Sequence, residues 1–276
     1  MQDPVVSVLI PAYRAEASVM ACLASLLAGG NVGVAAEFLL ESDDGTDYAA
    51  AAALSPAVKV GRTGLVRSGV GAARNRALAR ALAPLVTYVD ADDTVSPDYL
   101  PRLLAAAYPR GAVAVTRVMA GGTELARFGT PGTALDFEGL ARHGASVRGL
   151  FPRERLAGFQ NDLSQDILHM TEVLLQRGPI PITGAIYDLH LAQGTVTAAD
   201  DFSARVDAAY VRHIARLAAA YAGHTGLGQA QAVFAAKRAL NQRYGEEGLP
   251  GESYYGFIAR TIRRMGDSPI SAANDG

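Results

Sequence analysis

Three carboxylates follow directly on a short apolar run in this chain. Residues 85–89, Leu-Val-Thr-Tyr-Val behind a proline, have the pattern of a buried strand, and Asp90, Asp92 and Asp93 come immediately after it. Ligands bind at strand ends in open α/β sheets, and carboxylate oxygens there suit Mg²⁺ or Mn²⁺, which commonly hold a phosphate. We therefore predict a ligand site at this strand end. The alternative is an acidic turn that only starts the next helix.

The bulk composition limits the class of protein. The chain has 276 residues, half of them apolar, and 25 basic residues face 27 acidic ones for a formal net charge of −2. Such a chain can bury a sizeable core, and its charge balance gives no sign of nucleic-acid binding. The single cysteine, Cys22, lies on the apolar stripe of a predicted helix, so we interpret it as a core residue. We see neither a signal-peptide pattern nor an apolar run long enough to span a membrane, so we expect a cytoplasmic protein.

Strands and helices alternate over the first 120 residues, which predicts parallel βαβ units. We predict strands over residues 5–10, 37–41, 58–61 and 85–89, with Pro11 stopping the first, and helices over 17–27 and 70–83. The carboxyl ends of all these strands fall on one edge of the sheet. That edge should gather residues 12–14, 43–44, 74–75 and 90–93.

The later pattern is less regular. Residues 112–119 and 123–128 predict a hairpin, so the sheet should be mixed. A helix is expected over 164–177 with Ser164 as its cap, then short strands over 186–190 and 195–197. Three helical segments follow, over about 203–222, 227–243 and 252–265. We expect one domain over 1–200, a helical C-terminal extension over 201–266, and a disordered tail over 267–276.

Four segments, in order, resemble the motifs of family 2 glycosyltransferases. They are Val-Ser-Val-Leu-Ile-Pro-Ala-Tyr at 6–13, Asp-Asp-Gly-Thr-Asp at 43–47, Gly-Ala-Ala-Arg-Asn at 71–75 and Asp-Ala-Asp-Asp at 90–93. The resemblance implies an α/β fold of the GT-A type, a Rossmann-like sandwich with a mixed, mainly parallel central sheet. It also implies metal-dependent, inverting transfer of a sugar from a nucleotide-diphosphate donor, with a UDP-sugar favoured, to a hydroxyl of a carbohydrate or lipid-linked acceptor.

The resemblance places the donor at the strand ends. The implied donor-binding residues are Pro11, Ala12, Tyr13, Asp43, Asp44, Arg74, Asp90 and Ala91. The segment after the first strand would hold the nucleoside, Asp43 or Asp44 would bond the base, and Asp90 would face the ribose. Asp92 would bind Mn²⁺ or Mg²⁺ on the diphosphate, and Asn75 and Asp93 are further candidate site residues without an assigned role. The chemistry agrees, because a divalent ion and an arginine both stabilise the charge that builds on a leaving diphosphate.

Transfer also needs a base for the acceptor hydroxyl. The family usually places an Asp after a Glu at the start of a helix beyond the hairpin, and Gln165-Asp166 stands at that place. Asp166 is therefore the candidate catalytic base, although it could be only a helix-start acid favoured by the macrodipole. His169 shares its helix face and could orient it. His190 stands where many relatives carry an arginine that would contact the diphosphate.

Two other functions fit part of the pattern. Residues 90–94 also match the Asp-x-Asp-x-Thr motif of haloacid-dehalogenase-like phosphatases, in which Asp90 would attack phosphorus and Lys237 is the only lysine downstream. Alternatively, Gln165 in place of an acid indicates a protein of the same fold that binds nucleotide sugars without turnover. The chain has no tryptophan, so the Gln-x-x-Arg-Trp motif of processive synthases is absent and single addition is favoured.

The last predicted helix is amphipathic. Apolar side chains recur at helical spacing over 254–265, while Arg260, Arg263 and Arg264 supply a basic side. We expect the apolar stripe to pack on the domain or on a second subunit. The alternative is a peripheral contact with a membrane surface, which would suit a lipid-linked acceptor. The sequence does not predict the oligomeric state.

Overall fold

The computed structural model describes residues 3–62, 64, 66–156, 158–191, 201–249 and 252–266. Within these ranges ten strands form one sheet in the order β3-β2-β1-β4-β9-β6-β10-β5, with β7 paired to β6 and β8 to β10. The strands are β1 (Val6–Ala12), β2 (Ala36–Ser42), β3 (Val58–Arg62), β4 (Leu85–Tyr88), β5 (Thr94–Val95), β6 (Ala112–Ala120), β7 (Thr123–Phe128), β8 (Ala134–Leu135), β9 (Gly149–Pro152) and β10 (Ile180–Leu191). The helices are α1 (Val19–Leu26), α2 (Ala49–Ala52), α3 (Val70–Arg80), α4 (Tyr99–Ala106), α5 (Phe137–Arg142), α6 (Gln165–Arg177), α7 (Phe202–Ala220), α8 (Leu227–Glu247) and α9 (Tyr254–Gly266), with short 3₁₀ turns η1 (Gly29–Gly33) and η2 (Arg153–Arg155).

The first half of the sheet is parallel, as the alternation of strands and helices predicts. β1 lies between β2 and β4, and β3 extends the sheet beyond β2. The prediction that Pro11 stops β1 is wrong, because β1 continues through Ala12. Pairing with β4 ends at Leu9, while pairing with β2 continues to Ala12, whose carbonyl accepts from the Asp43 N–H at 2.8 Å. Successive strand residues face opposite neighbours, so the missing N–H of Pro11 falls on the β4 side, where no ladder needs it.

The second half of the sheet is mixed. β9 runs antiparallel between β4 and β6, the hairpin of β6 and β7 is confirmed, and β10 lies parallel to β6. β10 begins earlier than the strand predicted over 186–190. Pro181 and Gly184 argue against a strand in the sequence, but Pro181 lies opposite β8 and Gly184 lies at a register shift between Ile182 and Ile186. The predicted strand over 195–197 and the predicted tail over 267–276 lie outside the described residues.

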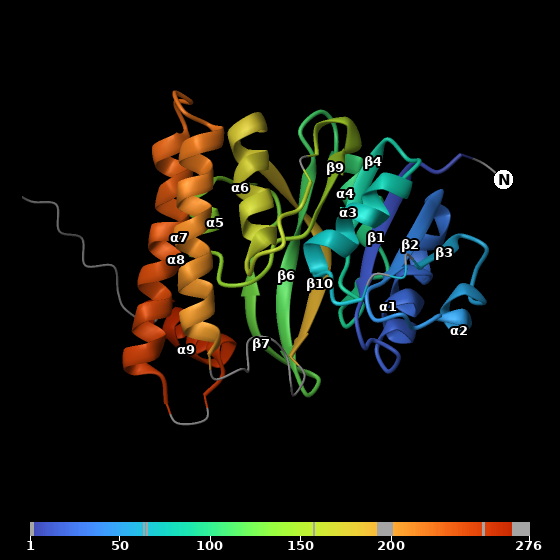
Figure 1. Cartoon of the computed structure of the whole chain (residues 1–276), viewed down its shortest axis with the longest axis horizontal. Helices are drawn as coiled ribbons and strands as arrows, with labels where there is room; N and C mark the ends of the chain where they lie inside the picture. The colour runs from blue at the N-terminus through green and yellow to red at the C-terminus, as the bar shows by residue number, and fades with distance from the viewer. Residues whose placement is uncertain are drawn as a thin grey trace, which may run out of the picture.

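The C-terminal helices stand on one side of the molecule, and the β1 to β4 half of the sheet stands on the other (Figure 1). α8 packs on α5 and α6, which joins these helices to the α/β part. In α9, Tyr254, Phe257, Ile258 and Thr261 are buried, and Arg260 pairs with Glu252. The described part of the apolar stripe therefore packs within the protein. The side chains of 262–266 lie outside the described ones.

Across the described ranges, no helix combines the length and apolar content that crossing a bilayer requires.

Candidate active site

A cavity of about 700 Å³ lies at the carboxyl ends of the parallel strands. Its lining brings together residues that are far apart in the sequence, namely Pro11, Ala12 and Tyr13 at the end of β1, Asp43 after β2, Arg74 on α3, Asp90, Ala91 and Asp92 after β4, and Asp166 at the start of α6. Parallel strands that end at one edge produce this gathering, as the sequence pattern predicts. Most of the predicted site residues therefore share one space.

The two acids that follow β2 are used differently. Asp44 does not line the cavity, because its carboxylate accepts hydrogen bonds from the Thr46 N–H at 2.8 Å, the Tyr48 hydroxyl at 3.1 Å and the Arg14 N–H. Partial burial opposes ionisation, but these donors outweigh it and lower the pKa of Asp44 to about 2. Asp44 thus ties the loop after β2 to the loop after β1.

Asp43 faces the cavity while it holds the next loop. Its carboxylate accepts from the Gly69 N–H at 2.9 Å, from Arg76 Nη2 at 2.9 Å and from both the N–H and the hydroxyl of Ser68. Burial raises its pKa, but these hydrogen bonds prevail and the pKa of Asp43 is lowered. Of the two acids suggested as base contacts, only Asp43 lies on the cavity wall.

A buried chain of alternating charge forms the floor. Asp90 accepts from Arg74 on one oxygen and from Arg148 Nη2, 2.5 Å away, on the other. Arg148 Nη1 lies 3.0 Å from Asp166 Oδ2, so a single guanidinium joins two carboxylates. The Arg74 and Arg148 guanidiniums are both buried and lie over the Tyr88 ring at 4.7 and 4.9 Å. Charge-assisted hydrogen bonds and ring contacts offset the cost of burying these ions.

The two arginines keep Asp90 and Asp166 ionised, and Asp92 takes no part in their salt bridges. Burial raises the pKa of Asp90 and of Asp166, but the two arginines outweigh it and hold both pKa values below the usual range. Asp92 is exposed at the cavity, and partial desolvation together with the charge of Asp90 raises the pKa of Asp92. Within the described part of the chain, Asp92 forms no ion pair, so its oxygens remain available to a ligand.

Sequence reasoning missed Arg148. It directly precedes β9, and β9 enters the sheet antiparallel beside β4, which brings Arg148 next to Asp90. A lone arginine in front of a short apolar run is the one signal in the sequence, since a charge beside a buried strand needs an acid nearby. Without knowledge of the β9 position, no particular acid could be assigned to it.

Asp93 and His190 lie outside the cavity lining and fasten β10 to the loop after β4. Asp93 is buried and accepts from the Tyr187 hydroxyl and from the His190 N–H at 2.8 Å. Burial, followed by the charge of Asp90, raises the pKa of Asp93. The His190 ring lies 2.8 Å from the Thr94 hydroxyl. These contacts support the loop that carries Asp92.

Asn75 also acts from behind the cavity. Its side-chain amide bonds both backbone groups of Phe159, at 2.8 and 2.7 Å, and so fixes the segment that runs towards α6. Gly71, in the same motif, packs directly on this segment, because a Cβ there would meet the Gln160 carbonyl oxygen at 1.9 Å. The glycine and the asparagine of the Gly-Ala-Ala-Arg-Asn motif therefore position a loop.

His169 does not hydrogen-bond Asp166, so the hypothesis that it orients this carboxylate is wrong. The His169 ring packs on Phe159 with centroids 4.5 Å apart, and neither ring nitrogen has a hydrogen-bond partner among the described residues. Burial, helped by the nearby Arg74, lowers the pKa of His169 to about 3, so the ring is neutral.

The predicted serine cap is also wrong, because Ser164 has a left-handed backbone with φ 56° and makes no side-chain cap bond.

The donor set at Asp92 suits a hard cation that arrives with its substrate. No cluster of three or more metal-ligating side chains occurs in the described ranges. Mg²⁺ is usually bound through one or two carboxylates together with substrate phosphates and water. One exposed carboxylate beside two buried arginines fits that mode and does not fit a metal held by the protein alone.

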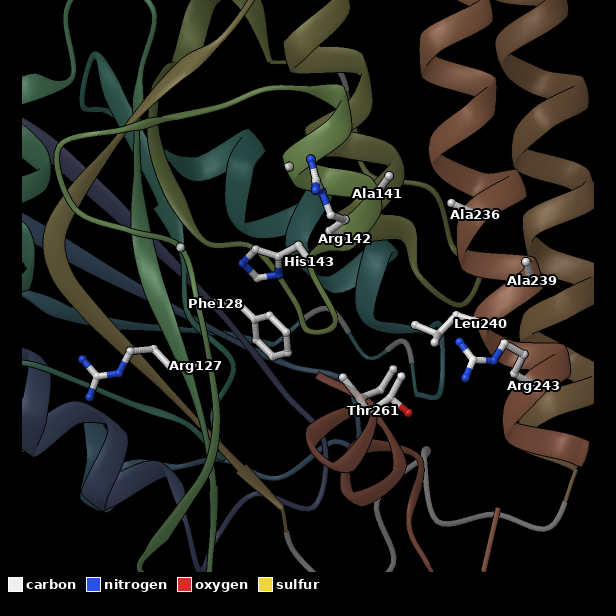
Figure 2. Close-up of a pocket in the computed structure, with 13 residues that line it drawn as sticks. Arg127, Phe128, Ala141, Arg142, His143, Ala236, Ala239, Leu240, Arg243 and Thr261 are labelled. Atoms are coloured by element: carbon white, nitrogen blue, oxygen red, sulfur yellow. The ribbon is translucent and has the colours of Figure 1, made fainter. Parts of the chain in front are cut away.

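A second large cavity has a different character. It lies between β7, α5, α8 and α9, and Figure 2 shows Phe128, His143 and Leu240 at its walls. Its volume is also about 700 Å³, but its lining is mainly apolar and includes no carboxylate among the described residues. It offers no oxygen ligands for a metal-bound diphosphate, so the cavity at the strand ends is the better candidate.

Solved structures share this fold. TarS from S. aureus, solved in complex with UDP-GlcNAc, matches with a TM-score of 0.62 and 18% identity over 87% of this chain and 72% of that one. The mannosyltransferase PcManGT from Pyrobaculum calidifontis, solved with GDP-Man and Mn²⁺, matches with a TM-score of 0.57 and 18% identity over 96% of this chain and 80% of that one. At these identities the likeness establishes the fold, which is α/β of the GT-A type.

Sequence comparisons identify the family. EpsH of Bacillus subtilis (strain 168), named as a glycosyltransferase, is 28% identical over 110 residues, which are 39% of this chain. The chain spans about a third of that relative's length, 31%. The family model described as glycosyl transferase family 2 matches residues 7–160, which include all the motifs at the strand ends. The chain therefore belongs to glycosyl transferase family 2.

Proposed function

We propose that this chain is a metal-dependent, inverting glycosyltransferase that adds a single sugar from a nucleotide-diphosphate donor to an acceptor hydroxyl. The observation that carries the proposal is the cavity at the strand ends. It combines one exposed carboxylate, Asp92, with the buried guanidiniums of Arg74 and Arg148 and with a further carboxylate, Asp166. Few other reactions need an anion site, an oxygen ligand for a divalent ion and a nearby base in one cavity.

The nucleoside would lie over the ends of β1 and β2. Tyr13 is 44% exposed at the cavity and offers a ring face for stacking, and Asp43 offers a carboxylate that can accept from a base N–H. Uracil presents such an N–H between two carbonyls, so a UDP-sugar is the donor we favour. The complex of TarS with UDP-GlcNAc supports this choice, whereas PcManGT was solved with GDP-Man.

The leaving diphosphate would face Asp92 and Arg74. Asp92 would hold Mn²⁺ or Mg²⁺, which supplies Lewis-acid stabilisation of the leaving oxygens when bound. Arg74 lines the cavity, so its guanidinium would place a positive charge beside the phosphate oxygens. Arg148 fixes Asp90 and thereby the loop after β4 that presents Asp92.

Asp166 would act as the base. It takes the proton of the acceptor hydroxyl while that oxygen bonds the anomeric carbon and the bond from that carbon to the phosphate oxygen breaks. A single displacement of this kind inverts the anomeric configuration. Arg148 keeps Asp166 ionised at neutral pH, so the proton-accepting form is fully populated, and it also fixes the direction of the carboxylate.

Mass spectrometry of donor turnover tests the proposal. UDP-sugars and GDP-sugars are incubated with the protein and Mn²⁺, and we expect release of the nucleoside diphosphate from one of them. Asp92→Asn should abolish that release. Donor binding without consumption would favour the non-catalytic alternative. Phosphate release from a generic phosphomonoester would favour the phosphatase, although both Asp90 oxygens are engaged by arginines and Lys237 does not line this cavity.

A further inference from the structure

A smaller cavity adjoins the candidate active site on the side of the C-terminal helices. Its volume is about 210 Å³, and it shares Gln165 and Asp166 with the larger cavity. The opposite wall comes from the extension, with Tyr210 of α7, Lys237 of α8 and Tyr255 of α9. Asp166 is thus the only carboxylate among the described residues that lines both spaces. Pockets for drug-sized ligands measure about 300–1,000 Å³, so this one suits a single ring.

Lys237 places a positive charge in this cavity without an ion pair of its own. Asp162 and Asp166 also line the cavity, but each of them pairs with an arginine, Asp162 with Arg212 and Asp166 with Arg148. The side chain is 5% exposed, and its ammonium donates to the His143 carbonyl oxygen at 2.7 Å. Among the described residues this is its one hydrogen bond and it forms no ion pair, whereas an ammonium has three donors. Lys59, the other lysine of the chain, is far more exposed and pairs with Glu37 at 2.7 Å. Burying an unpaired charge is costly, so a site that retains one points to an anion that arrives with a ligand.

Two further features favour a ligand here. Gln165 lines both cavities, and its Oε1 is buried without a hydrogen-bond partner in the described ranges. The tyrosine walls supply flat apolar faces, and few polar groups converge between them, which is the usual composition of a small-molecule site. Burial, opposed by Asp166, lowers the pKa of Lys237 to about 8, so the ammonium form still prevails at pH 7.

We propose that this cavity is the acceptor subsite and that it takes a single hydroxylated ring carrying a carboxylate or a phosphate. The anionic group would meet Lys237, a hydroxyl would meet Gln165, and the attacking hydroxyl would lie at Asp166. The inference rests on the proposed function, because the attack needs a donor in the adjoining cavity. The competing explanation is structural: Lys237 would only cap the carbonyl that follows α5.

Lysine-selective NMR separates these explanations in the wild-type protein. The chain has two lysines, so protein labelled with ¹³C-lysine gives two sets of side-chain signals, and Lys59 serves as an internal control. With UDP and Mg²⁺ already saturating, the protein is titrated with inorganic phosphate, with glucuronate and with glucose. We expect a saturable shift of the Lys237 signal with phosphate or with glucuronate, and none with glucose. The anion that shifts the Lys237 signal, phosphate or glucuronate, shows whether the charged group of the acceptor is a phosphate or a carboxylate. No shift with either anion, or equal shifts at Lys59, would overturn the inference.

Matched variants separate this inference from the proposed function. Lys237→Gln should lower the affinity for the anion that shifts the Lys237 signal by about tenfold or more, as expected for a lost hydrogen bond to a charged group. Lys59→Gln should leave that affinity unchanged. Neither substitution should change UDP affinity in the presence of Mg²⁺ by more than about twofold. If the wild type fails to bind UDP while Lys237 still binds the anion, the proposed donor site is wrong. If UDP binds and the anion does not, only the acceptor subsite is wrong.

Discussion

Replacing Arg148 with methionine should strongly destabilise the protein. Arg148 is 1% exposed and joins Asp90 to Asp166. Among the described residues, its removal leaves Asp166 buried without an ion pair and Asp90 with Arg74 alone. Removal of one partner from a buried pair costs about 3–5 kcal/mol, because an uncompensated charge is left behind. Methionine fills much of the space, so lost volume contributes little to this figure. A total stability of about 5–15 kcal/mol would fall by a large fraction.

The destabilisation caused by Arg148→Met should be largest near neutral pH and should decrease in acid. The pKa values of Asp90 and Asp166 are lowered in the folded protein, so both carboxylates stabilise it above their unfolded pKa of about 3.9. That contribution is lost as pH falls through the folded values. Without Arg148 the folded pKa values rise, so acid should remove less stability from the variant than from the wild type. The difference between the two should shrink towards about pH 3, where unpaired carboxylates are neutral.

Urea unfolding followed by circular dichroism measures both effects. Arg142→Met is the matched control, because Arg142 is exposed and pairs with Glu138 four residues away, an arrangement worth about 0–1 kcal/mol. We expect the loss for Arg148→Met to exceed that of the control by at least about 2 kcal/mol at pH 7. Equal losses for the two variants, or a loss for Arg148→Met that stays constant down to pH 4, would refute the account of the buried charges.

Three further substitutions test the site. Asp166→Asn should lower transfer by about 10²-fold to 10⁴-fold with donor affinity almost unchanged, and an unchanged rate in a coupled assay for released nucleotide would remove Asp166 as the base. Asp93→Asn should leave the Mn²⁺-dependent gain in UDP affinity intact, because Asp93 bonds Tyr187 and the His190 backbone; a lost gain in calorimetry would place Asp93 among the metal ligands. Gly71→Ala should cost about 1–3 kcal/mol by overpacking, and an unchanged melting temperature would contradict the close approach to Gln160.

The sequence predicts the parallel half of the sheet well, for a physical reason. Buried parallel strands are continuous apolar runs, and each one here is followed by polar residues that mark its end. The same rule predicts that Asp43, Arg74 and Asp90 share one edge, which the structure bears out. The division of labour between Asp43 and Asp44 could not be predicted, because it depends on which carboxylate the Arg14 and Thr46 N–H groups reach.

The strand order in the second half of the sheet could not be predicted from local sequence patterns. β9 has four residues and pairs antiparallel with β4 on one side and β6 on the other. In each pairing the two partner residues are more than thirty positions apart in the chain. Its position depends on long-range pairing, so neither Arg148 nor its bonds to Asp90 and Asp166 could be predicted. His169 illustrates the opposite error, since helical spacing places it on the Asp166 face while packing on Phe159 turns its ring into the core.

Isothermal titration calorimetry of UDP, with and without Mn²⁺, tests the central claim most directly. The wild type should bind UDP more tightly in the presence of Mn²⁺, and Asp92→Asn should lose that gain while it keeps the wild-type affinity measured without metal. Because Asp92 is exposed, its substitution should not disturb the fold, so misfolding would not account for a lost gain. An unchanged circular dichroism spectrum of the variant checks this point. A Mn²⁺-dependent gain of equal size in both proteins, or no UDP binding by the wild type under either condition, would contradict the assignment of this cavity as a metal-dependent donor site.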